Sequence, residues 1–150
     1  MGKYNRIIFV CQSGTARAQM ASAIMKRQII SENMEIEAKG LVVLMPEPIN
    51  QKAEAVMQYH GLNFEKEMSK QLTEEDFGDS TLVVTMNMQQ KQKIYSDYKN
   101  AKNVCVLSEI AGEEGEILDP YGGPLTGYEK CFEEIQELVT KMTNRLGTIN

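Results

Sequence analysis

The stretch IIFVCQSGTARA, residues 7–18, joins a short apolar run to a small polar loop. Four consecutive apolar residues, Ile7 to Val10, are typical of a parallel strand that is covered on both faces. After the loop, apolar residues recur at the spacing of one helical face from about Arg17 onward. The loop is therefore predicted to lie at the carboxyl end of a strand and to lead into a helix. Ligands of open α/β sheets bind at that place.

The rest of the chain alternates between the same two patterns. Further apolar runs predict strands at residues 34–41, 81–86 and 103–107, beside the first strand at 6–11. Helical patterns follow Pro48 up to about residue 59 and fill residues 87–98, and a final helix carries an apolar stripe. That stripe consists of Tyr128, Phe132, Ile135, Leu138, Val139, Met142 and Leu146. Alternation of strand and helix predicts an α/β fold with a parallel sheet, in a single domain over residues 1–150.

Composition excludes several classes of function. The 150 residues include 16 basic and 21 acidic side chains, for a net charge of -5, which argues against nucleic acid and membrane partners. No apolar stretch approaches the roughly 18 residues that span a bilayer, and the first residues do not resemble a signal peptide. The three cysteines, Cys11, Cys105 and Cys131, are too few and too scattered for a disulfide framework or a zinc site. We therefore expect a cytoplasmic protein.

Cys11 and Arg17 are separated by five residues, and this spacing suits phosphate chemistry. The backbone N–H groups of such a loop can point at one anion, together with the N-terminus of the helix. Arg17 can bind two phosphate oxygens at once. A cysteine in that field deprotonates readily and becomes a nucleophile. By itself the spacing is also compatible with a buried strand cysteine and a solvated helix arginine.

A thiolate mechanism also needs a proton donor for the leaving group. The single histidine, His60, lies near a predicted helix end and is expected to be structural. Asp119 is the better candidate, because Pro120 restricts the backbone beside it and Tyr121 could form a pocket wall. An ordinary Asp-Pro surface turn remains an equally good interpretation of these residues.

Taken together, VCQSGTAR at residues 10–17 and DPYGG at 119–123 resemble the low-molecular-weight protein tyrosine phosphatases. The resemblance covers essentially the whole chain. It implies a three-layer sandwich in which a four-stranded parallel sheet has helices on both faces. It also implies a phosphocysteine intermediate on Cys11, phosphate binding by Arg17 and by the loop residues Gln12, Ser13, Gly14, Thr15 and Ala16, and acid–base catalysis by Asp119. No metal or other cofactor is implied, and the partners are a phosphorylated protein or peptide and inorganic phosphate or another oxyanion.

The loop departs from the usual Cys-x-Gly-Asn-x-Cys-Arg-Ser pattern of the family at several positions. Gly14 replaces the asparagine whose side chain braces the loop, Ala16 replaces the second cysteine, and Ala18 replaces a serine that steadies the thiolate. We therefore expect weaker activity than in typical members. The alternative is a non-catalytic or weakly active phosphate-binding homologue.

Two further comparisons concern the substrate. Tyrosine-directed members tend to carry an apolar residue at the position of Thr15 and two aromatic residues after Asp-Pro, whereas this chain has only Tyr121. The bacterial protein arginine phosphatases of the family look similar to this chain at both places, so phosphotyrosine and phosphoarginine both remain candidates. A related arsenate reductase would need two more cysteines close together, but Cys105 and Cys131 lie in apolar patterns and are expected to belong to the core.

Overall fold

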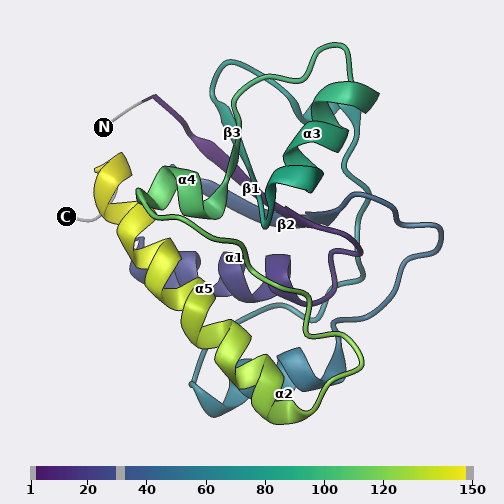
Figure 1. The fold of residues 1–150 in the computed structure, drawn as a ribbon, viewed down its shortest axis with the longest axis vertical. Helices are drawn as coiled ribbons and strands as arrows, with labels where there is room; N and C mark the ends of the chain where they lie inside the picture. Colours follow the sequence, from purple (N-terminus) through teal and green to yellow (C-terminus); the bar gives the residue numbers. More distant parts are fainter. Residues whose placement is uncertain (1–2, 30–32, 148–150) are drawn as a thin grey trace.

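A computed structural model describes residues 3–29 and 33–147 of the chain (Figure 1). Along the sequence it contains β1 (Arg6–Cys11), α1 (Arg17–Gln28), β2 (Glu35–Gly40), α2 (Gln51–Tyr59), the 3₁₀ turn η1 (Glu74–Asp76), β3 (Thr81–Thr85), α3 (Met88–Asp97), β4 (Val104–Val106), α4 (Leu107–Ala111) and α5 (Leu125–Leu146). All strand pairs are parallel, in the order β2-β1-β3-β4. The predicted four-stranded parallel sheet with helices around it is confirmed.

The two faces of the sheet are covered by different helices. Ile7 and Phe9 on β1 face a large core that α1 and α5 close, and Figure 1 shows α5 crossing α1 on that side. The alternate residues Ile8 and Val10 face a smaller cluster that includes Ile94 of α3. Because β1 lies inside the sheet, all of its residues after Arg6 are buried, which explains the continuous apolar run.

Side-chain caps and glycines set the bounds of several helices. The Asn50 side chain accepts hydrogen bonds from the N–H groups of Lys52 and Ala53 and so begins α2. Asn87 caps α3 in the same way. The long helix α5 ends at Gly147, whose φ of 69° is the left-handed conformation that glycine adopts without strain.

Two details differ from the sequence-based expectations. The predicted fourth strand ends at Val106, because Leu107 begins the short helix α4. Neither α4 nor η1 was predicted, because elements of five and three residues are too short to show a helical period. The edge strand β2 alternates between buried and more exposed residues, whereas the interior strands, apart from Arg6, are continuously buried.

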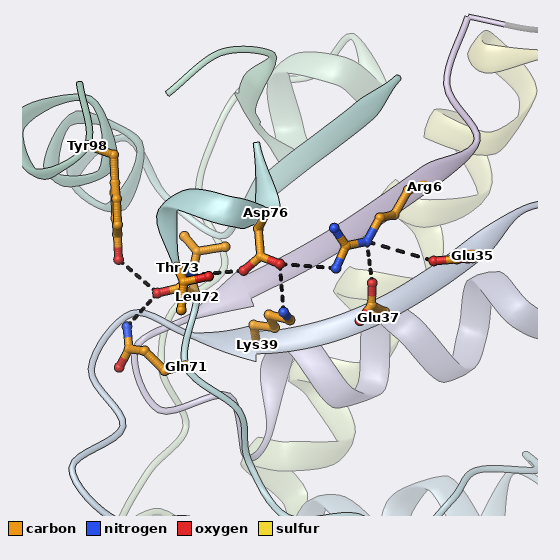
Figure 2. A network of polar contacts seen from close by, with 9 residues as sticks. All are labelled: Arg6, Glu35, Glu37, Lys39, Gln71, Leu72, Thr73, Asp76 and Tyr98. Atoms are coloured by element: carbon orange, nitrogen blue, oxygen red, sulfur yellow. Dashed lines mark hydrogen bonds and ion pairs between the residues drawn. The ribbon is translucent and has the colours of Figure 1, made fainter. Parts of the chain in front are cut away.

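A polar network fastens η1 to the edge of the sheet (Figure 2). The buried carboxylate of Asp76 accepts hydrogen bonds from Lys39 on β2 at 2.7 Å, from Arg6 on β1 at 3.0 Å, and from the N–H of Thr73 at 2.8 Å. Arg6 also donates to Glu37 at 2.5 Å. Arg6 also lies 3.9 Å from Glu35, so two cations and three acids compensate one another where β1, β2 and η1 meet.

The same network continues beyond η1 through the backbone of Leu72. Its carbonyl accepts hydrogen bonds from the Tyr98 hydroxyl at 2.8 Å and from the Gln71 side chain at 2.9 Å (Figure 2). Leu72 itself is fully buried in the smaller core. The backbone at Leu72 is thereby held against Gly40 at the end of β2, and Gly40 in turn contacts the loop that follows β1.

We predict that Asp76→Asn makes the protein less stable and less sensitive to acid. Burial alone would raise the pKa of Asp76, but the hydrogen bonds from Lys39 and Thr73 and the nearby Arg6 hold it below its ordinary 3.8. The carboxylate therefore contributes stability that is fully present above pH 3.8 and is lost as the pH falls through the lowered pKa. We expect Asp76→Asn to reduce the free energy of unfolding by about 2–3 kcal/mol at pH 7.

Denaturant unfolding between pH 7 and pH 2 measures this effect. The difference between parent and Asp76→Asn should narrow in the acid range. Asp79→Asn is the matched control, because that carboxylate pairs with Lys102 while remaining 89% exposed. An equal loss of stability in both variants would contradict the role assigned to Asp76.

Candidate active site

The loop from Cys11 to Arg17 leaves the carboxyl end of β1 and enters α1, as predicted. Within the described part of the chain, no side chain caps the start of α1, where Ala16 occupies the N-cap position. The N–H of Ala18, in the first turn, instead lies 3.4 Å from the Cys11 Sγ and donates to it. Cys11 is therefore buried at the N-terminus of α1, where the helix dipole is positive.

Two close backbone contacts fix the course of this loop. Gly14 has a φ of +73°, and a Cβ at this position would lie 2.7 Å from the backbone nitrogen of Gly40. In turn, a Cβ on Gly40 would lie 2.6 Å from the carbonyl carbon and oxygen of Ser13. The loop thus packs directly on the backbone at the end of β2, and both glycines are required for that approach.

Further hydrogen bonds brace the loop from the helices behind it. The Gln19 side chain donates to the Gly14 carbonyl at 3.0 Å, and the N–H of Asn50 donates to the Thr15 carbonyl at 2.9 Å. The hydroxyl groups of Ser13 and Thr15 bond to each other at 2.7 Å. These contacts hold the backbone of a loop in which Gly14 has no side chain of its own.

Arg17 connects the loop to a segment one hundred residues later in the sequence. Its guanidinium is buried and donates from Nη1 to the Ile117 carbonyl at 2.9 Å. Its Nη2 lies 3.7 Å from Oδ2 of Asp119, whose side chain is half exposed. A buried guanidinium requires such partners, because unpaired burial of a charge is costly. The segment before α5 is therefore held over the loop.

The Asp119 turn presents one carboxylate oxygen to the pocket. Oδ1 accepts a hydrogen bond from the N–H of Tyr121 at 3.0 Å, which leaves Oδ2 facing Arg17. A turn at Gly122, with a φ of +80°, then leads the chain into α5. Tyr121 is 81% exposed at the edge of the pocket, where it can contact a ligand.

A small polar pocket of about 30 Å³ brings most of the predicted site residues together. Its lining consists of Cys11, Ser13, Thr15, Ala16, Arg17, Asn50, Asp119, Tyr121 and Tyr128. Gly14 does not line this pocket, because it turns toward Gly40. Gln12 lines a neighbouring cavity of about 370 Å³ that shares Arg17 and Asp119.

Three contributors to the site were not foreseen from the sequence: Gln19, Asn50 and Tyr128. Asn50 carries a helix-capping signal, and Tyr128 belongs to the apolar stripe of α5, so neither pattern indicates a ligand site. His60, in contrast, lies away from the pocket, where it bonds to Glu129 at 2.7 Å and stacks on Phe132. These contacts agree with the expectation that His60 has a structural role.

The remaining cysteines are held as neutral thiols. Cys131 is buried on α5, and Cys105 is partly buried against the same core. Burial raises the pKa of each thiol to about 12. Among the described residues, no three His, Cys, Asp or Glu side chains gather to hold a metal ion, and no helix is long and apolar enough to cross a membrane.

Comparison with known proteins places this site in context. The model of the low molecular weight phosphotyrosine protein phosphatase family matches residues 6–149. The low molecular weight protein-tyrosine-phosphatase PtpB of Staphylococcus haemolyticus is 33% identical over 137 residues, which cover 91% of this chain and 96% of that protein. The corresponding protein of Staphylococcus aureus is 30% identical with the same coverage.

Solved structures show the same similarity. The YwlE arginine phosphatase from Geobacillus stearothermophilus superposes with a TM-score of 0.86 and 28% identity, over 95% of this chain and 93% of that one. A low molecular weight protein tyrosine phosphatase from T. tengcongensis gives 0.84 and 31%, over 93% and 97%. A YwlE arginine phosphatase mutant with a phosphorylated active-site serine gives 0.83 and 28%, over 95% of both chains.

We predict that Gly40→Ala disturbs the loop although Gly40 lies outside it. The new methyl group would overlap the Ser13 backbone, which cannot rotate away as a flexible side chain can. We expect the free energy of unfolding to fall by about 1–3 kcal/mol, and the affinity for inorganic phosphate to fall with it. Gly78→Ala is the control, because its Cβ would meet its nearest neighbour, the Thr81 hydroxyl, at an ordinary 3.8 Å. Calorimetric titration with phosphate and denaturant unfolding test both expectations, and unchanged affinity in Gly40→Ala would contradict them.

Proposed function

Because the chain belongs to the low molecular weight phosphotyrosine protein phosphatase family, we propose that it hydrolyses phosphorylated tyrosine or arginine side chains of proteins through a phosphocysteine intermediate on Cys11. The observation that carries this proposal is the convergence of Cys11, Arg17 and Asp119 on one pocket at the carboxyl edge of the sheet. A nucleophile, an anion clamp and a proton donor are the three groups that such a reaction needs.

In the first step, the Cys11 thiolate attacks the phosphorus atom of the bound phosphoryl group. The S–P bond forms as the bond from phosphorus to the leaving oxygen or nitrogen breaks. Backbone N–H groups of residues 12–16 and the Arg17 guanidinium bind the nonbridging oxygens, where negative charge accumulates. Protonated Asp119 donates its proton to the leaving atom, and the dephosphorylated side chain departs.

In the second step, the Asp119 carboxylate accepts a proton from water, which attacks phosphorus opposite the sulfur. The new O–P bond forms, the S–P bond breaks, and Cys11 returns as a thiolate beside inorganic phosphate. The similarity to a YwlE arginine phosphatase mutant with a phosphorylated active-site serine supports a covalent intermediate at this loop position.

The local contacts support turnover rather than phosphate binding alone. The absence of an asparagine at Gly14 and of a serine at Ala18 raised the alternative of an inactive homologue. However, the Gln19 side chain braces the Gly14 carbonyl, and the Ala18 N–H reaches the Cys11 sulfur. The thiolate therefore retains a donor without the missing hydroxyl.

We predict that Cys11→Ser abolishes hydrolysis of a chromogenic aryl phosphate while inorganic phosphate still binds. A serine hydroxyl is a much weaker nucleophile than a thiolate in the same loop. Asp119→Asn should lower kcat by about a hundredfold or more, since it removes the proton donor. Absorbance assays and calorimetric phosphate titration measure the two effects. Phosphate binding without turnover in the parent would favour the non-catalytic alternative.

Thr15 bears on the choice between the two substrates. It lines the pocket, and its hydroxyl bonds to that of Ser13 at 2.7 Å. This polar pair suits the phosphorylated guanidinium of arginine better than the apolar face of a phenol ring. We also propose that the threonine hydroxyl helps to orient the attacking water. We therefore expect the parent to prefer phosphoarginine.

We predict that Thr15→Ile shifts this preference toward phosphotyrosine. An added apolar surface favours the ring and removes the hydroxyl, so the ratio of kcat/KM for phosphotyrosine and phosphoarginine peptides should rise about tenfold or more. Thr15→Ser is the matched control, because it keeps the hydroxyl that bonds to Ser13. An unchanged ratio of kcat/KM for the two peptides in Thr15→Ile would contradict the role of Thr15 in substrate selection.

A further inference from the structure

Tyr128 combines a core position with a polar end inside the candidate active site. It lies in the first turns of α5, is 1% exposed, and packs its ring in the large core beneath the sheet. Tyr128 also lines the pocket of about 30 Å³ that contains Cys11, Arg17 and Asp119. A phenylalanine would fill the same place in the apolar stripe, so the hydroxyl requires a separate explanation.

The direction of one hydrogen bond determines where the Tyr128 proton can go. The Asn50 Nδ2 donates to the Tyr128 oxygen at 3.2 Å. The amide cannot be reversed without cost, because its Oδ1 already accepts from the N–H groups of Lys52 and Ala53 at 2.9 and 3.1 Å. The Tyr128 oxygen is therefore the acceptor in this pair, and its own proton is left to donate elsewhere.

Among residues 3–29 and 33–147, the Tyr128 hydroxyl donates no hydrogen bond, and its one bond is the one that it accepts from Asn50. A buried hydroxyl that leaves its donor unused loses free energy that a ligand can restore. The polar groups of the pocket surround a place for an oxyanion, whose oxygens are strong acceptors. The hydroxyl also stays protonated, because burial, together with nearby acidic groups that include Asp119, raises the pKa of Tyr128.

We propose that the Tyr128 hydroxyl, aimed by the Asn50 amide, donates a hydrogen bond to a nonbridging oxygen of the phosphoryl group bound at the Cys11 loop. The proposal rests on the proposed phosphatase function and adds a donor from α5 to those of the loop and Arg17. The Tyr128 hydroxyl would reach the phosphoryl group from α5, whereas the loop N–H groups and Arg17 reach it from the start of α1. In this proposal α5 therefore helps to hold the phosphoryl group in line with Cys11.

Tyr128→Phe tests the donor directly, because it removes only the hydroxyl. A hydrogen bond to a charged oxygen in a buried site predicts a loss of about tenfold to a hundredfold in affinity for inorganic phosphate, and a similar loss in kcat/KM for an aryl phosphate. Tyr95→Phe is the matched control: the Tyr95 hydroxyl accepts from the Val104 N–H at 3.4 Å and lies on α3, outside the pocket lining. Parental phosphate affinity in Tyr128→Phe would overturn the inference.

Asn50→Asp tests the direction of the hydroxyl without changing Tyr128. Aspartate caps a helix as well as asparagine does, so α2 should remain intact. A carboxylate only accepts hydrogen bonds, so the Tyr128 proton would turn toward it and away from the pocket. We expect Asn50→Asp to lose phosphate affinity, and to lose little more when combined with Tyr128→Phe. Losses that multiply in the double variant would contradict the aiming role of Asn50, because the new charge would then act independently of the hydroxyl.

These measurements separate the inference from the proposed function. A parent that binds phosphate but hydrolyses neither phosphopeptide would refute the phosphatase proposal, while the affinity of Tyr128→Phe for phosphate still decides the role of the hydroxyl. A parent that turns over normally, with Tyr128→Phe unchanged in affinity and rate, would refute the inference alone.

Discussion

The site depends on the pairing of the buried Arg17 guanidinium. Arg17 is the first residue of α1, and its guanidinium donates to the Ile117 carbonyl and faces the Asp119 carboxylate. A charge at this depth is stable only with such partners. Its pairing therefore brings a segment from the end of the chain over a loop from its beginning. Cys11 and Asp119 line one pocket because the Arg17 guanidinium takes both of its partners, Ile117 and Asp119, from the segment before α5.

The loop itself shows how a departure from a family pattern can be accommodated. Gly14 lacks a side chain, but it permits a backbone approach to Gly40 that a larger residue would block. The Gln19 amide and the Ala18 N–H then provide polar contacts from α1. Both contacts come from α1, behind the loop. The loop can thus keep its shape with small residues at Gly14, Ala16 and Ala18.

The edge strand β2, next to β1, supports the Cys11 loop from outside the pocket. Asp76 fastens η1 to Arg6 and Lys39, and Lys39 directly precedes Gly40 in β2. The Gly40 N–H donates to Lys70 and its carbonyl accepts from Leu72, so the end of β2 is held by the following segment. A rigid β2 end gives the loop a fixed surface to pack on. The polar network of Figure 2 thereby contributes to the geometry of a site that it does not touch.

Much of the fold and part of the site could be read from the sequence, because they depend on local patterns. Apolar runs and helical periods predicted the strands, the main helices and a loop at the carboxyl end of β1, and the spacing of Cys11 and Arg17 indicated phosphate chemistry in that loop. Asp119 was a candidate from its neighbours Pro120 and Tyr121, but an ordinary Asp-Pro surface turn explained these residues equally well until the family resemblance was added. The short elements η1 and α4 were missed for lack of a period.

The tertiary structure alone decided which side chains face the pocket. Tyr128 follows the apolar period of α5, and a periodic pattern places the ring in the core without indicating where the hydroxyl ends. Asn50 can be recognised in the sequence as a helix cap. The NH2 end of its side chain, however, donates to the Tyr128 hydroxyl only because α2 and α5 pack together. Local sequence determines which backbone conformations and faces are available. Contacts between distant segments depend on the packing of the whole chain, because buried charges and hydroxyls find their partners only there.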